Sequence, residues 1–112
     1  MKTAWYKGFE KVKRGVFIFE IDKAIREYFY KKGVEKFYLH AGGHGIGIEV
    51  HEPPKIFYKN RKDIIEDGMV FTIEPGLYFP DKFGIRLENI VIVEKGRGEI
   101  YSEIDLDLQS ID

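Results

Sequence analysis

The sequence contains no cysteine and only two serines, Ser102 and Ser110, both near its carboxyl end. Without cysteine the chain cannot form disulfides, thiolate zinc sites or cysteine nucleophiles, so any metal ion must be held by histidine and carboxylate side chains. The position of the two serines argues against a serine triad. Candidate chemistry is therefore confined to the three histidines and the carboxylates.

A strong charge of one sign and long apolar runs are also missing. The 18 Lys+Arg and 19 Asp+Glu residues give a net charge of -1, which does not indicate a nucleic acid or a membrane as a partner. No stretch approaches the ~20 apolar residues that span a bilayer, and the amino terminus lacks the apolar run of a signal peptide. We therefore expect a cytoplasmic protein. The 33% of charged residues, mostly Lys and Glu, fits the surface of a thermophile's protein.

The residues that are present suffice for one folded domain over residues 1–112. Apolar residues make up 44% of the chain and aromatic residues 15%, well above the content of a disordered sequence. A chain of this length buries roughly two thirds of the surface that its unfolded form exposes. A hydrophobic core is therefore expected without covalent or metal crosslinks.

Two helices are predicted at the start of the chain. Trp5, Phe9 and Val12 recur at helical spacing and predict a helix over residues 3–14. A second helix is predicted over residues 20–32, with acidic residues in its first turn and lysines in its last. We expect the apolar stripe of this second helix to face the core. Its members are Ile21, Ala24, Ile25, Tyr28 and Phe29.

Strand patterns and turn signals follow the second helix. Residues 46–51 alternate under a run of glycines, and Pro53-Pro54 excludes both a helix and the interior of a sheet. Asp67-Gly68 marks a turn before a strand that begins at Met69. The longest β-rich run, residues 85–93, is predicted to pair antiparallel with that strand. Further predictions are a short strand over 37–40, loops over 60–67 and 78–84, a turn over 95–98, a strand over 99–104 and an acidic tail.

All three histidines fall within the thirteen residues from His40 to Glu52, interleaved with four glycines. Glycine removes the β-carbons that would keep a ligand or a backbone away from His44. His44 could instead be a loop histidine in a flexible hinge, and His40 and His51 could be half-exposed strand residues bonded to backbone carbonyls. A straight strand sends His44 and His51 to opposite faces, so both serve one site only if the chain bends after Gly47.

Two glutamates occupy strand positions, where glutamate is disfavoured. Glu74 ends an apolar strand before Pro75-Gly76, and Glu88 lies within the run 85–93 on the same face as Arg86 and branched apolar residues. A buried carboxylate has to be paired, bind a metal or take up a proton. If the two strands pair, the glutamates can meet at one end of the sheet.

An imidazole and two carboxylates from three strands are ligands that divalent manganese, cobalt, iron or zinc prefers. A cation between Glu74 and Glu88 would also relieve their mutual repulsion. The alternative is that Glu88 pairs with Arg86 at a partly wet edge, while Glu74 accepts hydrogen bonds from a turn. Spacing alone does not decide between these two interpretations.

Four segments of the chain resemble the pita-bread metallopeptidases, the family of prolidase, aminopeptidase P and methionine aminopeptidase. The resemblance runs from the first helix to Val93 and is closer to the proline-directed members, prolidase and aminopeptidase P. It implies an α+β fold in which two amino-terminal helices pack on a curved antiparallel sheet, half of a pita-bread. The segments are Gly43-His44-Gly45-Ile46-Gly47, Val50-His51-Glu52-Pro53-Pro54, residues 68–76 and Gly84-Ile85-Arg86-Leu87-Glu88-Asn89.

The resemblance, rather than the spacing, implies which residues bind metal. In this family two divalent cations share five ligands, and His44, Glu74 and Glu88 match three of them, with Glu88 bridging the cations. The other two ligands are aspartates on strands before the first helix, and this sequence lacks them. From the residues present we therefore expect at most one site per chain for Mn, Co, Zn or Fe.

The resemblance also implies which residues meet a peptide substrate. His51 is expected to contact the scissile carbonyl, and His40 to line the site. Tyr78 takes the place of a hydrogen-bonding tyrosine, and Arg86 that of an arginine behind the metal ligands. The implied reaction is metal-dependent hydrolysis of an X-Pro bond, with His51 and Glu74 as catalytic residues and Glu74 relaying a proton.

Three functions remain open from the sequence. The chain is expected to be a truncated Xaa-Pro dipeptidase or aminopeptidase that is weak or inactive alone. It could instead be a non-catalytic domain that binds a metal or a peptide, or one half of a split peptidase whose second chain bears the aspartates. An uncovered sheet edge and apolar face also predict a homodimer or a complementing chain.

Overall fold

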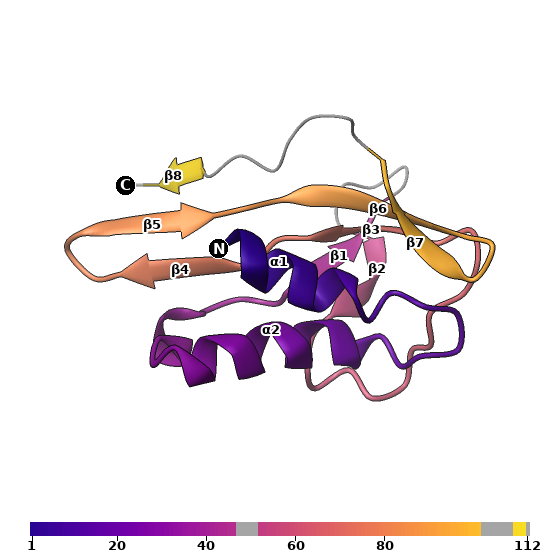
Figure 1. Ribbon diagram of the computed structural model, residues 1–112, viewed down its shortest axis with the longest axis horizontal. Coiled ribbons are helices and arrows are strands. Elements are labelled where there is room, and N and C mark those ends of the chain that lie inside the picture. The colour runs from indigo at the N-terminus through magenta and orange to yellow at the C-terminus, as the bar shows by residue number, and fades with distance from the viewer. Residues whose placement is uncertain (47–51, 102–108, 112) are drawn as a thin grey trace.

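The computed structural model describes residues 1–46, 52–101 and 109–111. Two helices, α1 (Lys2–Phe9) and α2 (Phe19–Lys31), run alongside a long antiparallel hairpin, and α1 packs against both α2 and the hairpin (Figure 1). A short 3-10 helix, η1 (Glu35–Phe37), follows α2. Within the described residues, no helix has the length and apolar character needed to cross a bilayer.

The predicted second helix is confirmed, and the first is shorter than predicted. The apolar stripe of α2 buries Ile21, Ile25 and Phe29. The helix α1 ends at Phe9 instead of continuing to residue 14. The chain leaves the helix after Phe9, and the carbonyl of Val12 accepts a hydrogen bond from the backbone N–H of Gly98 in β7, 3.1 Å away. A tertiary contact with a distant strand thus overrides the helical spacing of the sequence.

The strands form two antiparallel sheets. The larger sheet has the order β2-β1-β3-β6-β7, and the smaller one has the order β4-β5-β8. The strands of the larger sheet are β1 (Gly43–Gly45), β2 (Glu52–Ile56), β3 (Val70–Ile73), β6 (Asn89–Glu94) and β7 (Arg97–Ile100). The strands of the smaller sheet are β4 (Gly76–Phe79), β5 (Phe83–Arg86) and β8 (Gln109–Ile111).

One long hairpin joins the two sheets, and it bends in the middle. Its first arm is β3 followed by β4, and its second arm is β5 followed by β6 (Figure 1). The pairs Ile73–Asn89 and Gly76–Arg86 flank the bend in one continuous register. Glu74 therefore lies opposite Glu88, and Leu87 donates its backbone N–H to the carbonyl of Pro75, 3.1 Å away. The single strand predicted over 85–93 is thus two strands that separate at the bend.

Four other predictions for strands and loops can be compared with the structure. Residues 37–40 form the end of η1 and an irregular segment instead of a strand. The loop predicted over 78–84 is a tighter turn between β4 and β5. Pro53-Pro54 lies in β2, which pairs only with β1 at the edge of its sheet, the position where missing N–H donors cost least. Of the strand predicted over 46–51 only Ile46 is described, and it follows β1 without belonging to it; residues 47–51 lie outside the described residues.

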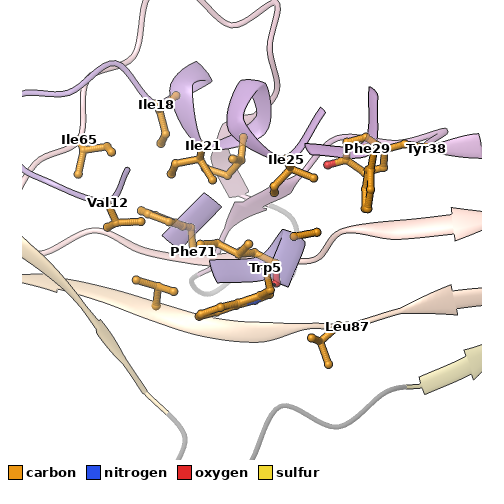
Figure 2. Packing of buried hydrophobic residues seen from close by; sticks show 14 of the residues in the cluster. Trp5, Val12, Ile18, Ile21, Ile25, Phe29, Tyr38, Ile65, Phe71 and Leu87 are labelled. Atoms are coloured by element: carbon orange, nitrogen blue, oxygen red, sulfur yellow. The ribbon is translucent and has the colours of Figure 1, made fainter. Parts of the chain in front are cut away.

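The hydrophobic core lies between the helices and the concave side of the hairpin. In Figure 2, Ile18, Ile21 and Ile25 of the α2 region point toward Trp5 and Phe71. Trp5 is completely buried and donates its Nε1–H to the carbonyl oxygen of Ile73, 2.8 Å away. This bond ties α1 to the strand residue directly before Glu74, so the core and the candidate site share an anchor.

Candidate functional site

A cavity of about 560 Å³ opens at the bend of the hairpin, beside β1 and β2. Three of the residues predicted for the site line it, namely His40, His44 and Glu74. The remaining lining residues are Ala41, Gly43, Pro53 and Lys55. The cavity therefore combines imidazole and carboxylate groups with one lysine and small or apolar neighbours.

His44 lies in the middle of β1, a strand held unusually close to β3. A β-carbon on Gly43 would overlap the carbonyl oxygen of Thr72, so only glycine permits this approach. The backbone N–H of His44 then donates to Thr72 Oγ1 at 3.1 Å. The glycine beside His44 thus serves backbone packing against β3, and His44 is a half-buried strand residue instead of a hinge residue.

The ring of His44 presents an acceptor nitrogen to Glu74. Its Nδ1 lies 2.9 Å from the carbonyl oxygen of Gly45, and because a carbonyl can only accept, Nδ1 carries the proton in the neutral ring. The Nε2 atom lies 3.8 Å from Oε2 of Glu74. In the neutral ring both of these atoms carry lone pairs, so a proton or a cation is needed to make their approach favourable. The neutral imidazole with one nitrogen held by a carbonyl is also the form that binds metals.

Glu74 and Glu88 form a cross-strand pair of like charges at the bend. Partial burial of Glu88 raises the pKa of its carboxyl group, and the charge of Glu74 and a hydrogen bond with Glu74 raise it further. The positive charges of Arg86 and His44 act in the opposite direction. Opposed like charges destabilise a sheet unless something neutralises them. The glutamates face each other one residue beyond the pair Ile73–Asn89, at the end of the five-stranded sheet, where the sequence pattern placed them.

The position of Glu88 differs from the one predicted. The sequence pattern placed it inside a continuous strand among branched apolar side chains, but it lies between β5 and β6, and its side chain is partly exposed. The buried face of the hairpin instead carries Leu87, Val91 and Val93. The alternative considered for Glu88, an ion pair with Arg86, does not form between these two described residues. Glu88 is thus directed away from the core and toward the site.

The side chains fit one part of a metal site. Within the described residues, no three histidine, aspartate or glutamate side chains surround one point closely enough to hold an ion. Their chemistry nevertheless suits a divalent cation, because an imidazole acceptor and two mutually repelling carboxylates are adjacent. Glu88 is partly exposed and shares a hydrogen bond with Glu74. The set therefore fits a divalent cation as a partial ligand set that further ligands would complete.

His40 and Tyr78 form a second pair of site residues. His40 Nδ1 lies 2.6 Å from the carbonyl oxygen of Ala41 and therefore donates to it. His40 Nε2 is then the acceptor for the Tyr78 hydroxyl, 2.8 Å away. A β-carbon on Gly76 would come within 2.9 Å of this Nε2 and 2.8 Å of the hydroxyl, so the glycine leaves room for the pair. The backbone-carbonyl partner considered for His40 is thus present, but His40 lies outside any strand.

Of the two remaining predicted residues, the structure describes Arg86 but not His51. Arg86, at the end of β5, is half-buried, and within the described part of the chain no hydrogen-bond partner reaches its Nε. Such a buried donor is ready to bind an acceptor. His51 lies outside the described residues, so its predicted contact with a substrate carbonyl stays a prediction.

Sequence reasoning missed several residues that shape this site. Lys55 lines the cavity, and it pairs with His44 across β1 and β2. Asp22 lies in the first turn of α2, where acidic residues favour the helix dipole, and its side chain is completely buried. Asp22 and Arg26 stand four residues apart beside the apolar stripe of α2, and that pattern could have indicated a buried pair.

Comparisons with known proteins agree on one family. Residues 1–95 match the model of metallopeptidase family M24. Over 100 residues the chain is 41% identical to an uncharacterised peptidase of Methanocaldococcus jannaschii, which covers 87% of this chain and 28% of that protein. Over 110 residues it is 36% identical to an Xaa-Pro dipeptidase of Lactobacillus helveticus, which covers 98% of this chain and 30% of that protein.

A solved structure shows the same fold. The chain superimposes on a prolidase from Thermococcus sibiricus with a TM-score of 0.90 and 39% identity, over 95% of this chain and 29% of that one. The predicted fold class, two helices packed on a curved antiparallel sheet as in half of a pita-bread, is confirmed. The chain spans less than a third of the length of each of these three proteins.

Proposed function

The chain belongs to metallopeptidase family M24, and we propose from this that His44, Glu74 and Glu88 contribute to a divalent-metal site for hydrolysis of Xaa-Pro peptides. The observation that carries the proposal is the cross-strand pair Glu74–Glu88, with the acceptor nitrogen of His44 at 3.8 Å from Glu74. Nothing in the packing of a sheet requires two facing carboxylates at this point. The Xaa-Pro preference is supported by relatives that are named Xaa-Pro dipeptidases.

Each residue has a distinct role in this proposal. When bound, the cation would polarise the scissile carbonyl and lower the pKa of water. Glu74 would take and return the proton that the reaction moves, because it is half-buried at the wall of the cavity. His40 and Tyr78 would position the peptide by hydrogen bonds, and His51 would contact its scissile carbonyl.

The amine of Lys55 and the guanidinium of Arg86 add positive charge near the carboxylates. Lys55 lines the cavity, so it would attract a negatively charged group of the peptide, such as its terminal carboxylate. The buried Nε of Arg86 would bind an acceptor that arrives with substrate or with the completing ligands. Residues 1–112 would thus act as a single unit that presents half of a catalytic cleft.

A site with two cations needs more ligands than three side chains supply. We propose that the remaining ligands, two aspartates by the family pattern, come from polypeptide other than residues 1–112. A second copy or a complementing chain could bring them, and on its own the chain would then hydrolyse Xaa-Pro peptides weakly or not at all. Light scattering of the purified chain at micromolar concentration should then give the mass of a homodimer, and a monomeric mass would exclude self-association. The predicted cytoplasmic location stays a prediction.

The alternative function is a domain that binds a metal or a peptide without catalysis. It is favoured by one observation, that no three described donors surround a common point. The two functions differ in an assay of Xaa-Pro hydrolysis with added Mn²⁺, Co²⁺, Zn²⁺ or Fe²⁺. Turnover that depends on Glu74 supports the peptidase, and metal binding without turnover in any assembled form supports the alternative.

Metal binding by titration calorimetry tests the proposed site directly. Wild-type protein should bind Mn²⁺, and Glu88→Ala should weaken that binding at least about tenfold because it removes one carboxylate ligand. Glu94→Ala is the matched control, since Glu94 is an exposed glutamate at the end of β6. Equal affinity of the Glu88 and Glu94 variants would overturn the assignment of Glu88, and absence of binding by the wild type would overturn the site.

A further inference from the structure

We propose that Asp22 and Arg26 of α2 are positioning residues for His40. They hold the backbone of residues 40–42 against the helix, so that the His40 ring keeps its proton on Nδ1 and offers Nε2 to Tyr78. The inference rests on the proposed function only in giving His40 a peptide to contact. The geometry that it assigns to His40 can be measured without any activity.

Asp22 forms the base of this arrangement. Its carboxylate is completely buried and accepts three hydrogen bonds, so each oxygen is satisfied. The Tyr38 hydroxyl donates to Oδ1 at 2.8 Å, and the backbone N–H of Tyr58 donates to Oδ2 at 2.7 Å. Burying a charged carboxylate costs free energy unless close partners compensate it, and these three donors are such partners. Asp22 therefore joins α2 to the segments before β1 and after β2.

Arg26 connects the buried Asp22 to the backbone of His40. Its Nε donates to Asp22 Oδ2 at 3.0 Å, and its Nη2 donates to the backbone carbonyl of His40, also at 3.0 Å. The guanidinium lies 4.4 Å from the ring centroid of Tyr38 and 4.5 Å from that of Tyr58, so stacking fixes its plane. A planar fork held on two faces has few alternative orientations. The position of the His40 carbonyl is thus set from the helix.

The segment that Arg26 holds also reaches the candidate metal ligands. Gly42 donates its N–H to the carbonyl of Ile56 in β2 and accepts from the N–H of Glu74, both at 2.7 Å. A β-carbon on Gly42 would lie 3.1 Å from Asp22 Oδ1 and 3.0 Å from the Tyr38 hydroxyl. The backbone at Gly42 is therefore packed directly on Asp22 and Tyr38. Loss of the pair would disturb His40 and the backbone before Glu74 together.

The His40 ring depends on this segment for its tautomer. Its Nδ1 donates to the carbonyl of Ala41, one residue beyond the carbonyl that Arg26 holds. Its ring also contacts Tyr38, with centroids 5.5 Å apart, and Figure 2 shows Tyr38 beside Phe29 near the end of α2. If the Ala41 carbonyl can rotate, the imidazole no longer has a fixed acceptor. Both tautomers then become available to it.

Long-range ¹H–¹⁵N NMR of the histidine rings in the metal-free protein tests the inference. Wild-type His40 should show one tautomer with the proton on Nδ1. Arg26→Met should shift the His40 nitrogen signals toward the averaged values of an unrestrained neutral imidazole. Arg97→Met is the matched control, because it removes an exposed arginine of β7 that pairs with Glu99. Its His40 signals should match those of the wild type.

A second variant covers the case in which Arg26→Met does not fold. Arg26→Lys keeps a positive charge beside Asp22 but cannot donate to Asp22 and to the His40 carbonyl in the same planar fork. The same averaging of the His40 signals is expected in this variant. Unchanged His40 signals in any folded Arg26 variant would overturn the inference, whatever the effect on thermal stability.

The proposed function is tested separately from this geometry. In an assembled, active form, Arg26→Lys should lower kcat/KM about 100-fold, since a misplacement of about 1 Å at a reactive centre has that effect. Averaged His40 signals together with unchanged kcat/KM would show that His40 is positioned but has no part in the reaction. That outcome overturns the proposed role of His40 and leaves the positioning by Arg26 standing.

Discussion

His44 Nε2 lies 3.8 Å from Glu74 Oε2, and each of these side chains is 19% exposed. The distance is too long for a hydrogen bond. It arises because Gly43 lets β1 approach β3 at the point where the hairpin bends. The pair is therefore a product of close backbone packing, and its nearest carboxylate neighbour, Glu88, is brought by the opposite arm of the same hairpin.

The raised pKa of Glu88 predicts that metal binding releases a proton. In the metal-free fold the carboxyl group keeps its proton to higher pH than an ordinary glutamate does, so below its raised pKa a cation has to displace that proton. The affinity for Mn²⁺ should therefore rise as the pH increases through the raised pKa. Calorimetry in buffers of different ionisation enthalpy measures the released proton. A pH-independent affinity over the acidic range would contradict this, and Glu94→Gln should behave as the wild type.

Gly43→Ala should strongly destabilise the fold. The new β-carbon would overlap the backbone carbonyl of Thr72, and backbone cannot move aside as a side chain can. We expect a loss of about 3 kcal/mol in the free energy of unfolding, measured by urea denaturation. Gly33→Ala is the comparison: Gly33 has a φ of +75° and open space around it, so only the dihedral cost of about 1–2 kcal/mol applies. Equal losses in the two variants would contradict the steric explanation.

Trp5→Phe should destabilise the protein and loosen the bend. It removes the buried Nε1–H that donates to the Ile73 carbonyl at 2.8 Å, leaving that acceptor unsatisfied. The expected loss is about 1–3 kcal/mol. Tyr30→Phe serves as the control because Tyr30 is 73% exposed. Chemical denaturation of both variants measures the difference, and a Trp5 variant as stable as the Tyr30 variant would show that the bond contributes nothing.

Asp22→Ala should lower the free energy of unfolding by about 3 kcal/mol, because the donors of Arg26, Tyr38 and Tyr58 would lose their buried acceptor. Burial raises the pKa of Asp22 above 3.8 in the fold, so the folded state holds this proton more tightly than the unfolded chain. Its contribution to stability is therefore greatest below pH 3.8 and declines as pH rises through the folded pKa. Urea denaturation at several pH values measures the difference in the free energy of unfolding between wild type and variant. This difference should become smaller as the pH rises from 3.8 through the folded pKa of Asp22. A gap that widens with pH would contradict the raised pKa.

Much of the fold could be predicted from local patterns, and some of it could not. The helix α2 was predictable because its apolar stripe and charged ends agree. The end of α1 was not predictable, because it depends on a hydrogen bond between the carbonyl of Val12 and the N–H of Gly98 in a distant strand. The break between β5 and β6 was hidden in a continuous β-rich run because both halves favour strands. The role of Gly43 in strand approach could not be separated from a ligand-facing role.

By itself the sequence determined the donor types, the family and the set of candidate residues. The absence of cysteine and the crowding of three histidines between residues 40 and 52 leave imidazole and carboxylate as the chemistry available. Only the tertiary structure decided that Glu74 and Glu88 face each other, because that depends on a register carried through a bend. It also decided that Asp22 and Arg26 lie behind His40, since burial of a helix charge depends on which segments pack over it.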